Sequence, residues 1–145
     1  MERIFVNTRS HTELVELTRE LKVLIARHSF KDGVLQLFSP QNTAALTFSD
    51  SASPDAQYDL LCALNVAVPW MQPHFRNPQG NSAAHVKAGM MGFCAALFVV
   101  NGELMLGQDQ GIFLCEFDGP KQRQVWVQLE SSKSVGGKFD RANPL

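Results

Sequence analysis

The sequence lacks long hydrophobic runs, blocks of like charge and a leader pattern. Its longest apolar run, residues 94–100, is far too short to span a membrane. The first residues, Met1–Phe5, show no basic segment followed by an apolar stretch, so a signal peptide is not indicated. The formal net charge is -1, which does not favour nucleic acid or an anionic lipid surface as a partner. We therefore expect a cytoplasmic protein that binds neither nucleic acid nor membranes.

Cysteine is also scarce. The three cysteines, Cys62, Cys94 and Cys115, are odd in number, and no pair has the spacing of metal ligands. All three have apolar neighbours in the sequence, which predicts buried free thiols in a reducing compartment.

What the sequence does contain fits one globular domain. The chain has 145 residues, of which 45% are hydrophobic, so it can bury a core without disulfides. Its patterns predict helices at about 18–28, 53–65 and 83–91, and strands at about 4–7, 13–17, 34–38, 43–48, 94–100, 103–106, 111–117 and 122–130. This order predicts an α+β fold, a compact single domain with a mainly antiparallel β-sheet packed with about three helices. We place the domain at 1–130 and expect 131–145 to be a flexible C-terminal tail.

Several residues mark the ends of these elements. Thr18 and Ser53 are expected to cap helices, and Pro54 suits a first helical position. Asn101-Gly102, between two apolar runs, predicts a β-hairpin. Residues 118–120 read Asp-Gly-Pro, and we expect the strands on either side of them to form a second antiparallel pair.

Gly80-Asn81, just before a predicted helix, is a candidate anion site. The first backbone amides of a helix point outward, the helix dipole favours negative charge, and glycine allows a ligand to approach closely. The alternative is a simple helix cap without a ligand.

His85 lies within the same predicted helix. It could act as an acid or base near neutral pH, or be a buried histidine that a backbone carbonyl satisfies. Asp50 and Asp59 stand on either side of the Ser53 helix start. They could hold magnesium or act as acid and base, or Asp50 could close a turn while Asp59 is solvated.

Glu116 lies in an apolar strand and needs a partner if it points inward. Arg123, across the turn, is the expected partner, and we interpret this pair as structural.

Four segments, in order along the chain, resemble the YjbQ family of thiamine-phosphate synthases. Residues 40–50 read PQNTAALTFSD and resemble the family's PHTTAALTINE. Residues 75–87 read FRNPQGNSAAHVK and resemble its Tyr-Arg-His, Gly-Asn and Ala-His-Leu-Lys stretch. Residues 101–111, NGELMLGQDQG, resemble NGxLxLGTWQG, and residues 116–123, EFDGPKQR, resemble EFDGPRxR. The likeness covers about residues 5–128, nearly the whole chain.

The resemblance implies a compact α+β fold that assembles as a homotrimer. It also implies a transferase that joins a pyrimidine pyrophosphate to a thiazole phosphate and expels pyrophosphate, normally with Mg²⁺. By this resemblance the phosphorylated small molecule would be held by the matched loops. The candidate catalytic residues are His85, Asp50 and Asp59, and the candidate substrate-binding residues are Gln41, Asn42, Thr43, Arg76, Asn77, Gly80, Asn81, Lys87 and Gln110.

The chain departs from the family pattern at several of these positions. Gln41 and Asn77 replace two family histidines, Asp50 replaces a glutamate, and residues 108–109 replace Thr-Trp. Glutamine and asparagine cannot shuttle protons near neutral pH and are poor zinc ligands. We therefore expect no histidine-bound transition metal, whereas Mg²⁺ bound by oxygen ligands stays open.

Three functions remain in view. The first is a thiamine-phosphate synthase-like transferase. Its reaction needs mainly positioning and charge stabilisation, so it can proceed without one of the histidines. The second is a catalytically impaired oligomeric protein that binds a small molecule or anion. The third is a hydrolase using the same pocket, for which the sequence shows no nucleophile signature.

Overall fold

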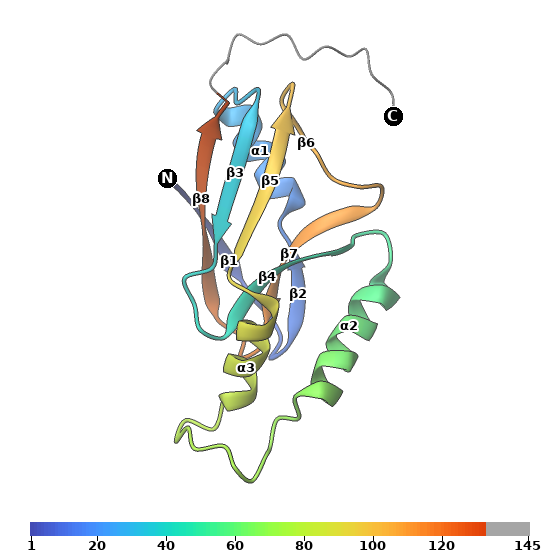
Figure 1. The fold of residues 1–145 in the computed structure, drawn as a ribbon, viewed down its shortest axis with the longest axis vertical. Helices are drawn as coiled ribbons and strands as arrows, with labels where there is room; N and C mark the ends of the chain where they lie inside the picture. The colour runs from blue at the N-terminus through green and yellow to red at the C-terminus, as the bar shows by residue number, and fades with distance from the viewer. Residues whose placement is uncertain (133–145) are drawn as a thin grey trace, which may run out of the picture.

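The computed structural model describes residues 1–132, which form two antiparallel sheets packed face to face (Figure 1). Strands β1, β8, β3, β5 and β6 form a five-stranded sheet in that order, and β2, β7 and β4 form a three-stranded sheet. The elements are β1 Glu2–Asn7, β2 Glu13–Glu16, α1 Thr18–Arg27, β3 Gly33–Phe38, β4 Ala44–Asp50, α2 Pro54–Ala67, α3 Ser82–Met91, β5 Cys94–Val100, β6 Glu103–Leu104, β7 Gln110–Glu116 and β8 Gln122–Ser131. The predicted fold class is confirmed. Ser131 belongs to β8, and the rest of the predicted tail, from residue 133, lies outside the described residues.

The main core lies between the two sheets and includes one face of α1. Alternate residues of each strand point into it, as the period of two requires. Leu35 and Val127 come from the five-stranded sheet, Leu46 and Leu114 from the three-stranded sheet, and Leu21 from α1. This burial is what holds the β4–β7 pair in a fixed register, because a slip of one residue would turn the leucines outward.

The outer face of the three-stranded sheet is covered by α2 and α3. A second apolar cluster lies there, made by Ala45, Cys115 and Phe117 from the sheet side and Leu64, Ala84 and Ala88 from the helices. In Figure 1 both helices stand at the lower end of the molecule, beside β4 and β7. They therefore place the N-terminus of α3 near the chain reversal between β7 and β8.

The outer face of the five-stranded sheet is open. Among residues 1–132 no helix lies over it, as Figure 1 shows for β8, β3 and β5. Phe5 and Phe98 on this face are 63% and 65% exposed. Strand β5 is apolar on both faces, a pattern typical of strands that are buried on both sides.

The helix starts were predicted with mixed success. Ser53 caps α2 as expected, since its Oγ accepts a hydrogen bond from the Ala56 amide at 3.1 Å. The prediction for α1 is wrong, because Leu17 is the N-cap and makes no side-chain cap bond. Thr18 is buried instead, and its Oγ1 accepts a hydrogen bond from the Ile112 amide of β7 at 3.2 Å.

The two predicted hairpins also differ in outcome. Asn101 and Gly102 both have positive φ angles, 53° and 79°, and join β5 to β6 as expected. The second predicted pair is wrong, because β7 and β8 belong to different sheets. The reason is the loop before β2, which binds the reversal between them: the Gly119 amide donates to the His11 carbonyl at 3.0 Å. Each strand then pairs with other partners.

The cysteines are less uniformly buried than expected. Cys115 is buried, and burial raises the pKa of its thiol to about 12. Cys62 is half-buried and Cys94 is exposed on the open sheet face, so for these two the prediction of burial is wrong. Within residues 1–132, no helix has the length and apolar character that crossing a membrane requires.

Candidate functional site

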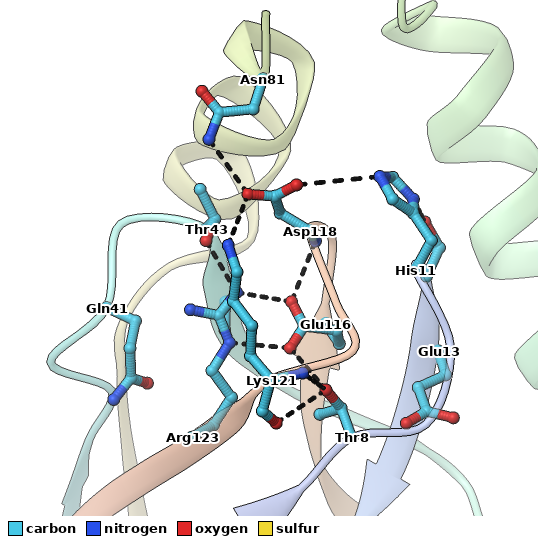
Figure 2. Close-up of polar contacts among 12 residues, drawn as sticks. Thr8, His11, Glu13, Gln41, Thr43, Asn81, Glu116, Asp118, Lys121 and Arg123 are labelled. Atoms are coloured by element: carbon cyan, nitrogen blue, oxygen red, sulfur yellow. Dashed lines mark hydrogen bonds and ion pairs between the residues drawn. The ribbon is translucent and has the colours of Figure 1, made fainter. Parts of the chain in front are cut away.

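A buried ion pair lies at the centre of the polar cluster shown in Figure 2. Arg123 donates two hydrogen bonds to the Glu116 carboxylate, from Nε to Oε2 at 2.7 Å and from Nη2 to Oε1 at 2.6 Å. Burial raises the pKa of Glu116, but the bonds from Arg123, the Asp118 amide and Thr8 outweigh it and hold that pKa below its usual range. The expected structural pair is confirmed, and Glu116 is held ionised.

Two threonines complete the coordination of this pair. Thr8 Oγ1 donates to Glu116 Oε2 at 2.9 Å, and Arg123 Nη2 donates to Thr43 Oγ1 at 2.7 Å. Throughout residues 1–132, every buried side-chain nitrogen and oxygen has a hydrogen-bond partner. The inner cluster is therefore a closed network that fixes the surrounding loops.

Asp118 forms an outer, more accessible layer above this pair. Its Oδ2 accepts hydrogen bonds from Asn81 Nδ2 at 3.0 Å and Lys121 Nζ at 2.7 Å, and its Oδ1 lies 3.9 Å from His11 Nε2 (Figure 2). Partial burial raises the pKa of Asp118, but the bonds from Lys121 and Asn81 outweigh it and lower the net value. His11 also packs edge-on against Trp70, with ring centroids 4.6 Å apart.

The N-terminus of α3 joins the same layer through the side chain of its N-cap residue, Asn81. Asn81 makes no side-chain cap bond to α3, so the interpretation as a simple cap does not describe its side chain. Its Oδ1 accepts instead from Asn77 Nδ2 at 2.8 Å. Within residues 1–132, no hydrogen-bond acceptor is found for the amides of Ser82 and Ala83. The Asn81 bond holds the Asp118 carboxylate beside this positive helix end.

The loop before β4 carries three of the predicted substrate-binding residues. Gln41 is engaged with the protein: its Nε2 donates to the Gln124 carbonyl at 3.0 Å and its Oε1 accepts from Ser39 Oγ at 3.1 Å. Thr43 is buried against Arg123, and Asn42 is exposed. Only Asn42 therefore presents a free side chain to solvent in this loop.

Asp50 and Gln110 meet at the other end of the three-stranded sheet. They are direct cross-strand partners on β4 and β7. Asp50 Oδ1 accepts from the amides of Ala52 and Ser53 at 2.8 and 3.1 Å, which closes the turn into α2. Both residues line a hollow of about 290 Å³ with Phe48, Ser49, Gln108 and Asp109.

Asp59 does not join this hollow. Gln57 reaches back from α2 to donate to the Asp50 carbonyl at 2.8 Å. Asp59 lies two residues further along the helix, on the far side of α2 from Gln57, and is exposed. The structure therefore does not bring Asp50 and Asp59 together.

The remaining predicted residues fall into two groups. Lys87 is buried between α2 and α3 and donates to Asn65 Oδ1, and burial lowers its pKa. His85 is half-buried, while Arg76 and Gly80 are exposed. Within residues 1–132, the side chains of His85 and Arg76 make no hydrogen bond, and no side chain bonds to the backbone of Gly80. Gly80 has a φ of 70°, which favours glycine at the turn before α3.

The predicted site is therefore split between two places. Ala44 pairs with Glu116 at one end of β4, and Asp50 pairs with Gln110 at the other, so the two groups lie about 20 Å apart along the strand. Among residues 1–132, no three histidine, cysteine or acidic side chains gather as metal ligands.

Sequence reasoning missed four residues of the polar cluster: Thr8, His11, Asp118 and Lys121. Asp118 was interpreted only as part of a turn, although it stands between Glu116 and Arg123, which were both singled out. Thr8 and His11 come from a loop more than a hundred residues earlier, since Thr8 and Lys121 are 113 residues apart. No local pattern marks them.

Comparison with known proteins shows that the described residues match one protein family. The family model described as UPF0047 protein YjbQ-like matches residues 2–132. UPF0047 protein YugU of Bacillus subtilis is 32% identical over 129 residues, which cover 89% of this chain and 98% of that protein. UPF0047 protein MJ1081 of Methanocaldococcus jannaschii is 32% identical over 130 residues, covering 88% of this chain and 92% of that one.

Solved structures show the same fold. A protein of the YjbQ/UPF0047 family from Clostridium acetobutylicum, described as uncharacterized, superposes with a TM-score of 0.86 at 32% identity, over 90% of this chain and all of that one. The conserved hypothetical protein TT1486 from Thermus thermophilus gives a TM-score of 0.84 at 37% identity, again over 90% of this chain and all of that one.

Proposed function

Because the chain belongs to the UPF0047 YjbQ-like family, we propose that it is a thiamine-phosphate synthase-like transferase acting on phosphorylated small molecules. The observation that carries this proposal is the hollow between Asp50 and Gln110, which has two carboxylates and two amide side chains on its wall. Its volume, about 290 Å³, is at the lower end of the range for small-molecule sites. The matched motif residues His85, Gly80 and Asn81 support the same activity.

The donor set of this hollow fits Mg²⁺. Asp50 uses only Oδ1 for the turn into α2, and within residues 1–132 its Oδ2 has no hydrogen-bond donor. Asp109 is exposed beside it. Mg²⁺ is commonly held by one or two carboxylates together with substrate phosphates and waters. Asp50 and Asp109 would hold the ion, which when bound would offset charge on the departing pyrophosphate.

The protein groups contribute position and charge. Gln108 and Gln110 can donate hydrogen bonds to phosphate oxygens at the hollow. The amides of Ser82 and Ala83 offer a second place for a phosphate, and the exposed Arg76 in the preceding loop adds positive charge to that loop. His85 is the matched group that can hold or move a proton on its imidazole.

A non-catalytic binding protein is the alternative, and one observation favours it. Gln41 and Asn77, which replace family histidines, both have their side chains engaged in hydrogen bonds with the protein. Neither side chain can titrate near neutral pH. Such a protein would keep the fold and bind an anion without turning it over.

We also propose that the protein is a cytoplasmic homotrimer. The open face of the five-stranded sheet supports assembly, since Phe5, Phe98 and the half-buried Trp126 would lose contact with water in an interface.

The test is formation of thiamine phosphate from the two phosphorylated precursors with Mg²⁺. We expect product from the wild type and at least a hundredfold slower formation by Asp50→Asn and by His85→Gln. Glu20→Gln on α1 and His28→Gln are matched controls that should keep the wild-type rate. If folded wild-type protein makes no product, while pyrophosphate binding is detected by calorimetry, the binding protein is the correct assignment.

A further inference from the structure

Three hollows join into one groove along the β5–β6 edge of the five-stranded sheet. The first, about 910 Å³, lies where β8 ends and is lined by Phe98 and Ser132 among others. Phe98 also lines the second, about 190 Å³, and Phe48 and Gln110 line both the second and the hollow beside Asp50. A path, which we call the edge groove, therefore runs from the end of β8 to Asp50.

The near end of the edge groove is balanced in charge, and its middle is apolar. Lys31 and Asp32 both line the near end, so their charges offset each other. In the middle, Phe98, Met105 and Phe48 are 65%, 54% and 38% exposed. Such exposure shows that no part of residues 1–132 covers these side chains, and exposed apolar surface of this kind marks a place where another group binds.

The far end of the edge groove is acidic. Asp50 and Asp109 are exposed there, and Glu16 lies close by, since a Cβ on Gly111 would come within 2.8 Å of its Oε1. Within residues 1–132, none of these three carboxylates forms an ion pair. Arg19, which follows Glu16 in α1, lines a different hollow, against β1. The far end therefore attracts a cation that its own neighbours do not supply.

Residues 133–145 have the composition that this groove requires. They follow Ser132 directly, beyond the part of the chain that the structure describes, and they read KSVGGKFDRANPL. The segment carries three basic side chains and one acidic one, and Phe139 stands between the cations Lys138 and Arg141. An aromatic side chain flanked by cations is complementary to an apolar groove that ends in carboxylates.

The segment is also long enough. The path along β5 and then β4 to the far end is roughly 20–25 Å, at about 3.3 Å per residue. By the same measure Lys138 extends up to about 20 Å beyond Ser132, and Arg141 up to about 30 Å. With their long side chains both cations reach the carboxylates, whereas Lys133, next to Ser132, does not.

We propose that residues 133–145 dock along the edge groove of their own chain, with Lys138 and Arg141 at the carboxylates of Asp50 and Asp109. Phe139 then covers the apolar middle. Exposed ion pairs are individually weak, so the docking is reversible, which agrees with the flexible tail expected from the sequence. The tether compensates, because it gives the segment an effective concentration in the millimolar range at the groove.

Both sides of this contact are features of this chain beyond its family pattern. Asp109 stands where the resembled pattern NGxLxLGTWQG has tryptophan, and the family match ends at residue 132. The acidic group and the basic segment that would bind it therefore occur together as departures from that pattern.

The docking is tested without any catalytic activity. In a full-length background of Cys62→Ala and Cys94→Ala, Ala142→Cys carries a nitroxide spin label, while Cys115 is buried and stays unreactive. In nitrogen-15-labelled protein we expect the amide signals at the far end, those of Ser51 and Asp109, to lose most of their intensity.

Two other regions give the comparison. The amides of Asn81 and Lys121, at the opposite end of the three-stranded sheet, should keep their intensity. Loss confined to the start of the segment, at Asp32 and Gly102, would mean that the segment does not reach the far end, and it would overturn the proposal.

Charge removal tests the contact from both sides. Lys138→Gln with Arg141→Gln, and separately Asp109→Asn, should each restore at least half of the lost intensity. Asparagine suits residue 109, whose φ is 56°. Asp59→Asn on the exposed surface of α2 is the matched control and should change nothing. Equal effects of the two asparagine variants would refute pairing at Asp109.

The competing occupant is the same segment of a neighbouring copy, because the homotrimer proposed above also covers Phe98. Spin-labelled protein without the isotope is therefore refolded together with isotope-labelled protein without the spin label. We expect no loss at Asp109 in this mixture. A loss as strong as that within the doubly labelled chain would show docking between copies and overturn the proposal.

Docking also has a consequence for the metal site, and this consequence alone rests on the proposed function. Mg²⁺ and the two cations would compete for Asp50 and Asp109, so Mg²⁺ should restore the Asp109 signal more than KCl at equal ionic strength. If the two salts act alike, Mg²⁺ does not bind in this hollow and that part of the proposed function fails. The loss measured before either salt is added still establishes the docking.

Discussion

Arg123 and Glu116 form a two-bond ion pair that is removed from solvent, with side chains 7% and 0% exposed. A buried pair of this kind is costly to break, because the remaining charge has no water to solvate it. We predict that Arg123→Met lowers the free energy of unfolding by roughly 3–5 kcal/mol in urea denaturation. The double variant Arg123→Met with Glu116→Leu should regain a large part of that loss. A single variant as stable as the wild type would show that the pair does not hold the fold.

The same pair makes stability depend on pH. The folded-state pKa of Glu116 lies below its ordinary value, so its stabilising contribution is present above the unfolded pKa, about 4.3, and is lost as pH falls through the folded pKa. We predict that the difference in unfolding free energy between wild type and Glu116→Gln is largest near pH 7 and shrinks steadily below about pH 4.3. Urea titrations from pH 7 to pH 3 measure it. A difference that grows on acidification would contradict this sign.

Gly119 should tolerate no side chain. A Cβ there would lie 2.4 Å from the Ser10 carbonyl oxygen and 2.8 Å from Glu116 Cγ. We predict that Gly119→Ala costs roughly 1–3 kcal/mol, because the loop before β2 and the ion pair must both shift. Gly89→Ala is the matched control: its Cβ meets no atom within 4 Å, and alanine in a helix should raise stability by about 1 kcal/mol. Equal effects at both sites would refute the close packing.

Restoring the family histidines tests the transferase directly. We predict that Gln41→His together with Asn77→His raises the rate of thiamine phosphate formation by about tenfold or more, because an imidazole can transfer protons that an amide cannot. The gain should fade as the pH falls below about 6.5, where histidine becomes charged. Measured rates from pH 5 to pH 9 give this profile. The control is Glu20→His on the exposed surface of α1, which should not change the rate.

The sequence predicted those features whose determinants are local. The Ser53-Pro54 helix start and the Asn101-Gly102 hairpin each depend on a few neighbouring residues, and both are confirmed. Thr18 looked like an N-cap for the same local reasons, but a tertiary bond to the Ile112 amide takes its hydroxyl into the core. Local propensity was overridden there by packing against β7.

The site was predictable only in pieces, because its assembly is not local. Motif order identified Asp50, Asn81 and Gln110, but gave no distance between them. The register of β4 on β7 sets that distance, and it follows from the burial of alternate residues in two clusters. His11 and Asp118 were missed because their contact joins two loops that are far apart in sequence.

The pairing of β1 with β8 determines when the five-stranded sheet can fold during synthesis of the chain. Strand β1 pairs with residues 122–127 of β8, and β3 pairs with residues 126–131 of the same strand. During synthesis, β1 and β3 leave the ribosome long before the strand that must lie between them. Their edges stay unpaired until then, which favours wrong strand pairing and slow, non-local folding. The five-stranded sheet can therefore close only after translation of β8 is complete.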